Sequence, residues 1–368
     1  MIFAIALTCS ATPQDSETPI SPVGLSDFYL ALEEDALGFG YHQGEWTEDY
    51  GDAAAFGAYY YSHAGHHQQV DHYIQIAQES KEYNLAIVEQ AIGDFPWMLQ
   101  NLEEVFMSAQ GLIEYTTVFQ DDSNELAIES LLDKVDPLLV ATGDYMDVSL
   151  GDFAADLYGP TSITAGVGVA YAQYAAYNQD DFGQKMRRRA EEIAETIHEQ
   201  AFHEDHYRFH PDVERQYLYP NATMLILLTR LFEITGDAVY LNRAETVFQG
   251  IQPLKMDDLG LYRSPYSEEA EGAQTDEYST LSSQNYLMLG LLSLYQHTSD
   301  PLYLEDIFLL LEHIRTRLYD EAEHKIVHHW IDGRAATPED PSYFCSGCNL
   351  QTLFVLWYLT TELGIELR

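Results

Sequence analysis

Residues 221–251 read NATMLILLTRLFEITGDAVYLNRAETVFQGI, and residues 283–314 read SQNYLMLGLLSLYQHTSDPLYLEDIFLLLEHI. Each stretch begins with an almost wholly apolar run, which is typical of a helix buried on most sides. A polar turn follows, Thr235-Gly236-Asp237 in the first and Thr298-Ser299-Asp300-Pro301 in the second. Asp before a helix and Pro in its first turn are helix-start signals, and an amphipathic run beginning with Tyr-Leu comes next. Both stretches therefore predict a helical hairpin.

The same two-helix pattern recurs elsewhere in the chain. Residues 162–197 repeat it with a polar break at 177–180. Two weaker copies precede that one, and they lie at 53–92, with a break at Ala64-Gly65, and at 102–139, with a break at 121–124. The sequence therefore contains five helical hairpins in succession.

A sixth hairpin can form between the two ends of the chain. The last apolar run, residues 349–363, has no partner after it, and the segment at 26–37 can supply one. We therefore predict an all-α fold, an (α/α)6 toroid of helical hairpins with apolar helices inside and amphipathic helices outside. An open solenoid of helical pairs is the alternative.

The connections between helices differ in length in a regular way. Turns within a pair are only a few residues long, whereas the segments before the apolar helices are long: 39–52, 148–160, 203–220, 256–280 and 320–346. Long loops that share one face of a scaffold are where binding and catalytic residues concentrate. We expect residues 25–368 to form one toroid domain with its functional site on that face.

The first residues differ in character from the rest. A short apolar run is followed by Cys9 and then by a polar, Pro-containing segment up to residue 19, so residues 1–24 form a segment of their own. The run resembles the end of a bacterial lipoprotein signal with Cys9 as the lipidated residue, although no basic residue precedes it and Thr8 stands where Gly or Ala is usual. The resemblance implies an exported lipoprotein, periplasmic or on the outer surface; an incidental cysteine is the alternative. No later apolar run is long enough to predict a transmembrane helix.

The charge of the chain excludes one class of partner. Sixty acidic residues against 17 basic ones give a net charge of −43. Such a field repels nucleic acids and anionic membrane surfaces, so membrane contact is expected only through a lipid anchor. The acidic residues are spread over many helices, which indicates a solvated surface.

The turn pattern, T-G-D or T-S-D-P before Tyr240-Leu241 or Tyr303-Leu304, resembles that of the six-hairpin glycosidase-like superfamily. The resemblance covers nearly the whole folded chain, but its motifs specify hairpins and not catalytic residues. It implies an active site among the loops that precede the inner helices. Its members include glycoside hydrolases, sugar epimerases and polysaccharide lyases. We expect a glycoside hydrolase acting on an oligosaccharide; the alternatives are an epimerase or lyase on the same fold and a non-catalytic, surface-tethered glycan-binding protein.

The connector at 39–52, FGYHQGEWTEDYGD, combines aromatic and acidic residues. Tyr41 and Trp46 could stack on a sugar ring, and Glu45 or Asp49 could act as acid or base. Glycoside hydrolysis requires two carboxyl groups about 5–10 Å apart. Carboxylates occur in any loop of so acidic a chain, and a solvated surface is the alternative interpretation.

Two further connectors offer carboxylates close to a predicted inner helix. Asp156 lies beside Tyr158, and Asp276-Glu277 precedes the helix expected from residue 282. The N-terminal end of a helix carries partial positive charge, so a carboxylate there serves either catalysis or helix capping. Both roles remain open for these residues.

Cationic candidates occupy the other two connectors. His206 and Arg208 lie before Tyr219, and His328 lies close to Trp330 in a predicted short hairpin that turns at 332–333. Either histidine could be the base of an epimerase or lyase, and Arg208 could bind a uronate carboxylate. Four other histidines, His63, His66, His67 and His72, fall at the first hairpin turn and are interpreted as surface residues.

Cys345-Ser346-Gly347-Cys348 stands at the start of the last inner helix. An exported protein favours a disulfide between the two cysteines, which is the first interpretation. Inert thiols, a metal site completed by His328 or His329, and a redox pair are the alternatives. No cofactor or metal is assigned from the sequence.

Overall fold

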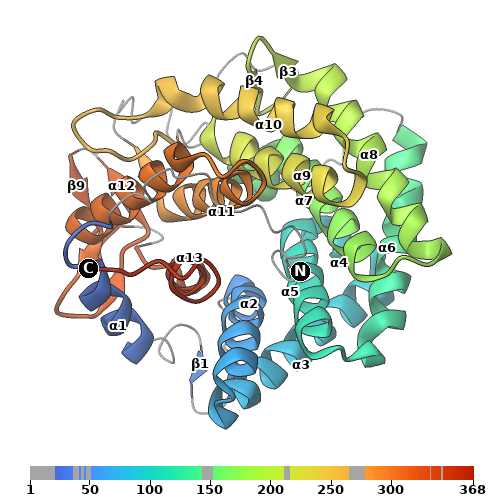
Figure 1. The fold of residues 1–368 in the computed structure, drawn as a ribbon. Coiled ribbons are helices and arrows are strands. Elements are labelled where there is room, and N and C mark those ends of the chain that lie inside the picture. The colour runs from blue at the N-terminus through green and yellow to red at the C-terminus, as the bar shows by residue number, and fades with distance from the viewer. Residues whose placement is uncertain are drawn as a thin grey trace.

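The computed structural model describes residues 21–35, 41–42, 45–46, 51–142, 152–210, 216–264, 278–331, 333–340 and 343–368. Six helices form an inner ring in which each packs against the next, and the last packs against the first. These are α2 (Gly51–Gln68), α5 (Leu102–Phe119), α7 (Asp152–Tyr177), α9 (Leu218–Thr235), α11 (Leu281–Thr298) and α13 (Ser346–Thr361). The predicted (α/α)6 toroid is confirmed, and the open solenoid is not (Figure 1).

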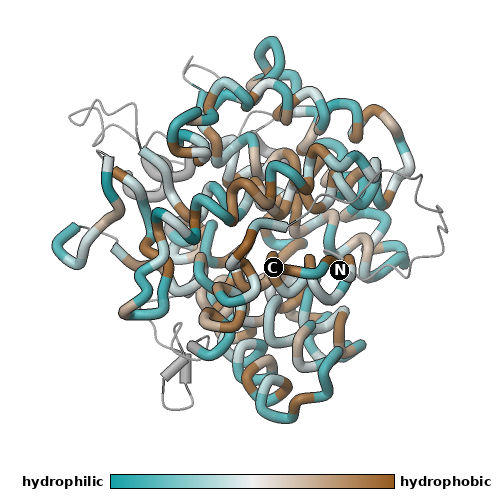
Figure 2. Tube along the Cα trace, turned by 60° about the vertical axis from the view of Figure 1, so that its left-hand side comes forward, coloured by the Kyte–Doolittle hydropathy of each residue, from teal (hydrophilic) through white to brown (hydrophobic). Residues whose placement is uncertain are grey.

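A second set of six helices surrounds the ring. They are α1 (Leu25–Asp35), α3 (Asp71–Gly93), α6 (Glu125–Thr142), α8 (Asp181–Ala201), α10 (Ala238–Ile251) and α12 (Pro301–Arg317). Short α4 (Phe95–Gln100) and two 3-10 turns, Asp122–Asn124 and Gln252–Leu254, lie between them in sequence. In Figure 2 hydrophilic colouring marks many of the outlying turns, while hydrophobic stretches run along the helices. Within the described residues no helix has both the length and the apolar character to cross a membrane.

The chain ends meet as predicted. Helix α1 packs against α13 and α12, beside the C-terminal end of the chain (Figure 1). The backbone N–H of Ser26 donates to the carbonyl of Arg368 at 3.1 Å, and the Ser21 hydroxyl donates to the carbonyl of Glu366 at 3.0 Å. The sixth hairpin is therefore assembled from the first and last helices of the described chain.

The turn pattern that predicted the hairpins has a common geometry. Helices α9 and α11 end in the left-handed conformation at Gly236 and Ser299. The next residue is Asp237 or Asp300, whose backbone N–H donates to the hydroxyl of the threonine two positions before it. Each aspartate carboxylate then accepts from a backbone N–H in the first turn of the outer helix. Thr and Asp are therefore required for local hydrogen bonding at the helix ends.

Two predicted boundaries were wrong. Helix α2 does not break at Ala64-Gly65 but continues to Gln68, and the reversal occurs at Gln69, where φ is 55°. Gly65 is needed for packing, because a Cβ there would lie 2.9 Å from the backbone nitrogen of Ile74 in α3. Helix α7 starts at Asp152, so most of the predicted connector 148–160 is helical. An aspartate in the first turn favours that earlier start.

Short antiparallel strands occupy the connectors. Three pairs form two-stranded hairpins: β1 (Tyr41–His42) with β2 (Glu45–Trp46), β3 (Phe202–His203) with β4 (His206–Tyr207), and β6 (Tyr319–Asp320) with β7 (Lys325–Ile326). The other three strands form one sheet in the order β5 (Ser279–Thr280), β8 (His329–Ile331), β9 (Arg334–Ala335). The predicted hairpin turning at 332–333 is the β8–β9 pair, with Gly333 at a φ of 80°. Ile326 belongs to the preceding β6–β7 hairpin.

Three buried amides fix the connectors to the inner helices in the same way. Each lies in the first turn of an inner helix and bonds both backbone groups of one connector residue. The pairs are Asn221 with Tyr207, Gln284 with Tyr262, and Asn349 with Ile326. This repeated contact holds connector backbone at the start of α9, α11 and α13.

We expect Asn221→Leu to lower the free energy of unfolding by about 1–3 kcal/mol, because it leaves the buried N–H and C=O of Tyr207 without these partners. Urea denaturation measures the change. The exposed Asn242→Leu in α10 is the matched control, with an expected change of about 0.5 kcal/mol or less. Equal effects of the two substitutions would show that the amide contact does not stabilise the fold.

Candidate functional site

One pocket opens on the axis of the ring, and all six inner helices contribute to it. It has a volume of about 740 Å³, which includes the part open to solvent. The lining residues come from the N-terminal half of α5, α9 and α11, from the middle of α7, from Gln351 and Phe354 of α13, and from Phe56 and Tyr59 of α2. The pocket therefore lies at the end of the ring where the long connectors enter the inner helices.

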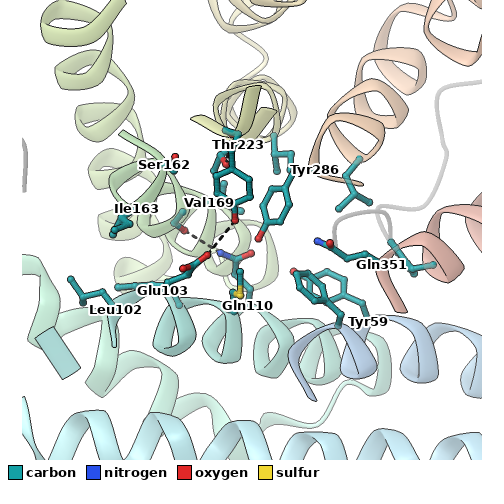
Figure 3. Close-up of a pocket in the computed structure, with 18 residues that line it drawn as sticks. Tyr59, Leu102, Glu103, Gln110, Ser162, Ile163, Val169, Thr223, Tyr286 and Gln351 are labelled. Carbon is teal, nitrogen blue, oxygen red and sulfur yellow. Dashed lines mark hydrogen bonds between the residues drawn. The ribbon is translucent and has the colours of Figure 1, made fainter. Parts of the chain in front are cut away.

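Most of the pocket wall is apolar, and a few polar groups converge within it. The apolar side chains are Phe56, Leu102, Phe106, Met107, Ile163, Val169, Ile226, Leu289 and Phe354. Figure 3 shows the polar ends of Glu103, Gln110, Tyr286 and Gln351 directed toward the middle of the cavity. A mostly apolar cleft with a few convergent hydrogen-bonding groups is the usual form of a small-molecule site.

Glu103 is the one carboxylate among the described lining residues. It lies in the first turn of α5, and its Oε1 accepts a hydrogen bond from the Tyr219 hydroxyl of α9 at 3.4 Å. The next residue, Glu104, does not line the pocket; burial raises the pKa of its carboxyl group. A carboxylate in the first turn also stabilises a helix, so the pocket position of Glu103 is what distinguishes it from Glu104.

Gln351 is a buried polar residue of the pocket wall whose side-chain amide makes no hydrogen bond within the protein. Its side chain is 2% exposed, and neither its amide oxygen nor its amide nitrogen has a hydrogen-bond partner in the structure. Gln110, in contrast, donates from Nε2 to the carbonyl of Gly166 at 3.2 Å. Because a buried amide without partners is costly, Gln351 points to a ligand that both donates and accepts hydrogen bonds.

A buried polar cluster adjoins the pocket wall at Tyr59. The Tyr59 hydroxyl donates to Oε1 of Gln173 at 3.4 Å, and Nε2 of Gln173 donates to Glu114 at 2.8 Å. The other oxygen of Glu114 lies 2.6 Å from Nε2 of His63. Burial raises the pKa of Tyr59 well above its ordinary value, so its hydroxyl keeps its proton.

The prediction of four surface histidines was wrong for His63. It is 7% exposed because its ring packs against Phe354 and Trp357 of α13, with centroid distances of 5.5 and 5.3 Å. Because α2 continues to Gln68, His63 lies within this inner helix and not at the turn after it. His66, His67 and His72 are exposed.

Several predicted site residues belong to segments whose side chains lie outside the described part. Tyr41 and Trp46 are opposite each other in the β1–β2 pair, and Glu45 is opposite His42. Asp156 and Tyr158 are within α7 and not in a loop. Asp49, Asp276, Glu277 and Cys9 fall outside the described residues. The carboxylate roles predicted for this group stay predictions.

Among the other predicted residues, Tyr219 lines the pocket, and four described residues do not. His206 lies in β4, and its Nδ1 is 3.0 Å from the Asp205 carboxylate. The backbone of Arg208 pairs with that of Gln216 in an isolated antiparallel β-bridge. Trp330 stacks with the Arg317 guanidinium, whose Cζ lies 5.6 Å from the centroid of the indole ring. His328 lies beside the Cys345–Cys348 disulfide. The structure therefore does not bring either predicted histidine base into the pocket.

The sequence patterns did not indicate Glu103, Gln110, Tyr286 or Gln351, because these residues lie in inner helices, whose apolar runs predict only packing. A usable signal existed in each helix. Polar side chains in the N-terminal half of an otherwise apolar inner helix must face either a partner or the ring axis.

No protein-family model matches the chain, and no curated protein matches it. Solved structures resemble it at low sequence identity. A sugar epimerase from a ruminal bacterium superposes with a TM-score of 0.68 at 12% identity, covering 92% of this chain and 99% of the other. A GH76 α-mannanase from Bacteroides thetaiotaomicron gives 0.65 at 13% identity, covering 93% and 98%. The unsaturated glucuronyl hydrolase from Bacillus sp. GL1 gives 0.63 at 13%, covering 92% and 95%. This chain thus has the six-hairpin α/α-toroid fold that these carbohydrate-processing proteins share.

Proposed function

We propose that this chain is a carbohydrate-active enzyme of the glycoside hydrolase type and that it binds an oligosaccharide in the ring pocket. The position of Glu103 carries the proposal. It places one carboxylate among aromatic and amide side chains in a cavity formed by all six inner helices. Sugars present apolar ring faces and hydroxyl edges, and this combination of Tyr, Gln and Glu complements both.

A neutral oligosaccharide fits the pocket better than an acidic one. No Lys or Arg is present among the described lining residues, and the chain has a net charge of −43. A uronate carboxylate would therefore find no cationic partner among these described residues. Arg208, the residue predicted for that role, is not part of the pocket wall.

Glu103 is assigned the role of general acid, with the Tyr219 hydroxyl as its hydrogen-bonding partner. Hydrolysis needs a second carboxylate about 5–10 Å away. Glu45, Asp49, Asp156, Asp276 and Glu277 are the candidates for it. Product analysis of the wild type and of Glu103→Gln on a panel of neutral glycans tests the assignment: shorter oligosaccharides indicate hydrolysis, and isomers of unchanged mass indicate epimerisation.

A glycan-binding protein without catalysis is the second candidate. The observation in its favour is that the described pocket holds a single carboxylate, whereas hydrolysis requires two. Binding isotherms on the same panel separate the two functions. Saturable binding without any product, unchanged by Glu103→Gln, would favour the binding protein.

We also propose that the chain is exported and lipidated at Cys9. The disulfide between Cys345 and Cys348 supports export, because such bonds persist in oxidising compartments. Metabolic labelling with a fatty acid, compared between the wild type and Cys9→Ser, tests the anchor.

We expect Gln351→Ala to raise KM about tenfold with a smaller effect on kcat, because the amide binds the sugar in the ground and transition states alike. A tenfold change in KM corresponds to about 1.4 kcal/mol of binding free energy, which is the size expected for the loss of one hydrogen bond. Steady-state kinetics on the best substrate of the panel measures it. Exposed Gln75→Ala is the control and should leave KM unchanged. An unaltered KM in Gln351→Ala would remove this residue from substrate recognition.

A further inference from the structure

A second group of chemically reactive side chains lies outside the ring pocket. His328, Cys345 and Cys348 each place a potential ligand atom within 4.8 Å of those of the other two. Cys348 is 2% exposed, whereas His328 and Cys345 are half-buried. None of the three lines the pocket, so the proposed carbohydrate site does not account for this cluster.

The three residues are held by backbone contacts on both sides. The backbone N–H of His328 donates to the carbonyl of Tyr343 at 2.8 Å, and its carbonyl accepts from Leu281 at 2.6 Å. Cys345 is the N-cap of α13, and its Sγ accepts from the backbone N–H of Cys348 at 3.1 Å. The cluster is therefore built on the residue that precedes β8 and on the start of α13, and backbone hydrogen bonds hold both.

The ligand types in this cluster match one class of metal ion. Two cysteine sulfurs and one imidazole nitrogen are the ligands that Zn²⁺ prefers, and three protein ligands leave the fourth tetrahedral position for water. With Zn–S distances of about 2.3 Å, two coordinating sulfurs lie roughly 3.8 Å apart. The disulfide keeps the sulfurs bonded to each other, so it excludes this arrangement until it is reduced.

We propose that Cys345, Cys348 and His328 form a redox-controlled binding site for one thiophilic divalent cation of the Zn²⁺ class. In the oxidised chain the site is closed by the disulfide. After reduction, both thiols lose their protons to solvent when the metal binds, and the imidazole supplies the third ligand. The N-terminal end of α13 stabilises the two thiolates.

The reductant used in the test is a water-soluble trialkylphosphine. One phosphine, one disulfide and one water give one phosphine oxide and two thiols, so the S–S bond breaks, two S–H bonds form, and phosphorus is oxidised. No other co-reactant is needed. The metal then replaces the two thiol protons.

The experiment uses the full chain with Cys9→Ser, which removes the third cysteine of the sequence. Co²⁺ is titrated under anaerobic conditions into oxidised protein and into reduced protein freed of phosphine. We expect the reduced protein to take up one Co²⁺ per chain, with the intense visible and sulfur-to-metal bands of tetrahedral thiolate coordination, and Zn²⁺ to displace it. The oxidised protein should show neither band. Equal spectra in the two states, or no sulfur-to-metal band after reduction, would overturn the proposal.

His328→Ala tests the third ligand. Loss of the imidazole should weaken Co²⁺ binding by at least about tenfold in the reduced protein. His72→Ala, a substitution of an exposed histidine on α3, is the control and should bind as the parent does. Equal affinities of the two variants would exclude His328 as a ligand. Because these measurements use metal binding and not turnover, their outcome is independent of the proposed carbohydrate activity.

Discussion

Glu103→Gln is expected to lower the rate of product formation by about 10²–10⁴-fold, because it removes the carboxyl proton that general acid catalysis requires. The amide has nearly the same shape and can still bond the Tyr219 hydroxyl, so the fold and the pocket should be preserved. Initial rates at saturating and at low substrate concentration measure the effect. The loss should appear in kcat and in kcat/KM alike, since the proton is transferred only in the transition state.

Glu104→Gln is the matched control for that substitution. The two residues are neighbours in the first turn of α5, and only Glu103 lines the pocket. If the carboxylates served only to stabilise the start of the helix, both variants would lose similar stability and similar activity. A Glu104→Gln variant with wild-type kinetics beside an inactive Glu103→Gln variant would separate catalysis from capping.

Trp357→Ala is expected to lower the free energy of unfolding by about 3–5 kcal/mol. The indole is fully buried on α13, where it packs against His63 at 5.3 Å and Phe354 at 5.9 Å between ring centroids. Helix α13 packs against α2 at the point where the ring closes, so the cavity would form at the contact between the two ends of the inner ring. Chemical denaturation measures the loss.

Leu126→Ala is the control for the tryptophan substitution, because Leu126 is 78% exposed on α6. It should change the free energy of unfolding by about 0.5 kcal/mol or less. A similarly small change in Trp357→Ala would mean that α13 is not packed in the core as described.

The fold was predictable from the sequence because its signals are local. The threonine hydroxyl accepts from the backbone N–H of the aspartate two residues later, and the aspartate carboxylate accepts from the first turn of the next helix, whatever the rest of the chain does. The sixth hairpin was predictable for another reason: an apolar helix at 349–363 without a partner must be covered by some other segment. Local signals failed at Gly65, where glycine is required by the close approach of α3 and not by a turn.

The site was less predictable, because it depends on which residues of separate helices face one axis. Glu103 and Tyr219 are 116 positions apart, and nothing in either local sequence shows that they meet. Tyr219 was found only because it lies at the end of a connector. His63 was misassigned for a related reason, since its burial depends on aromatic residues almost 300 positions later in the chain.

A crystal structure of the Glu103→Gln variant soaked with the tightest-binding neutral glycan of the panel shows whether the ring pocket is the carbohydrate site. We expect a sugar ring in the ring pocket, with its hydroxyl groups bonded to the Gln351 amide and its face against the tyrosines of the wall. A glycan that binds in solution but is found on another surface, with the Gln351 amide still without a partner, would contradict it.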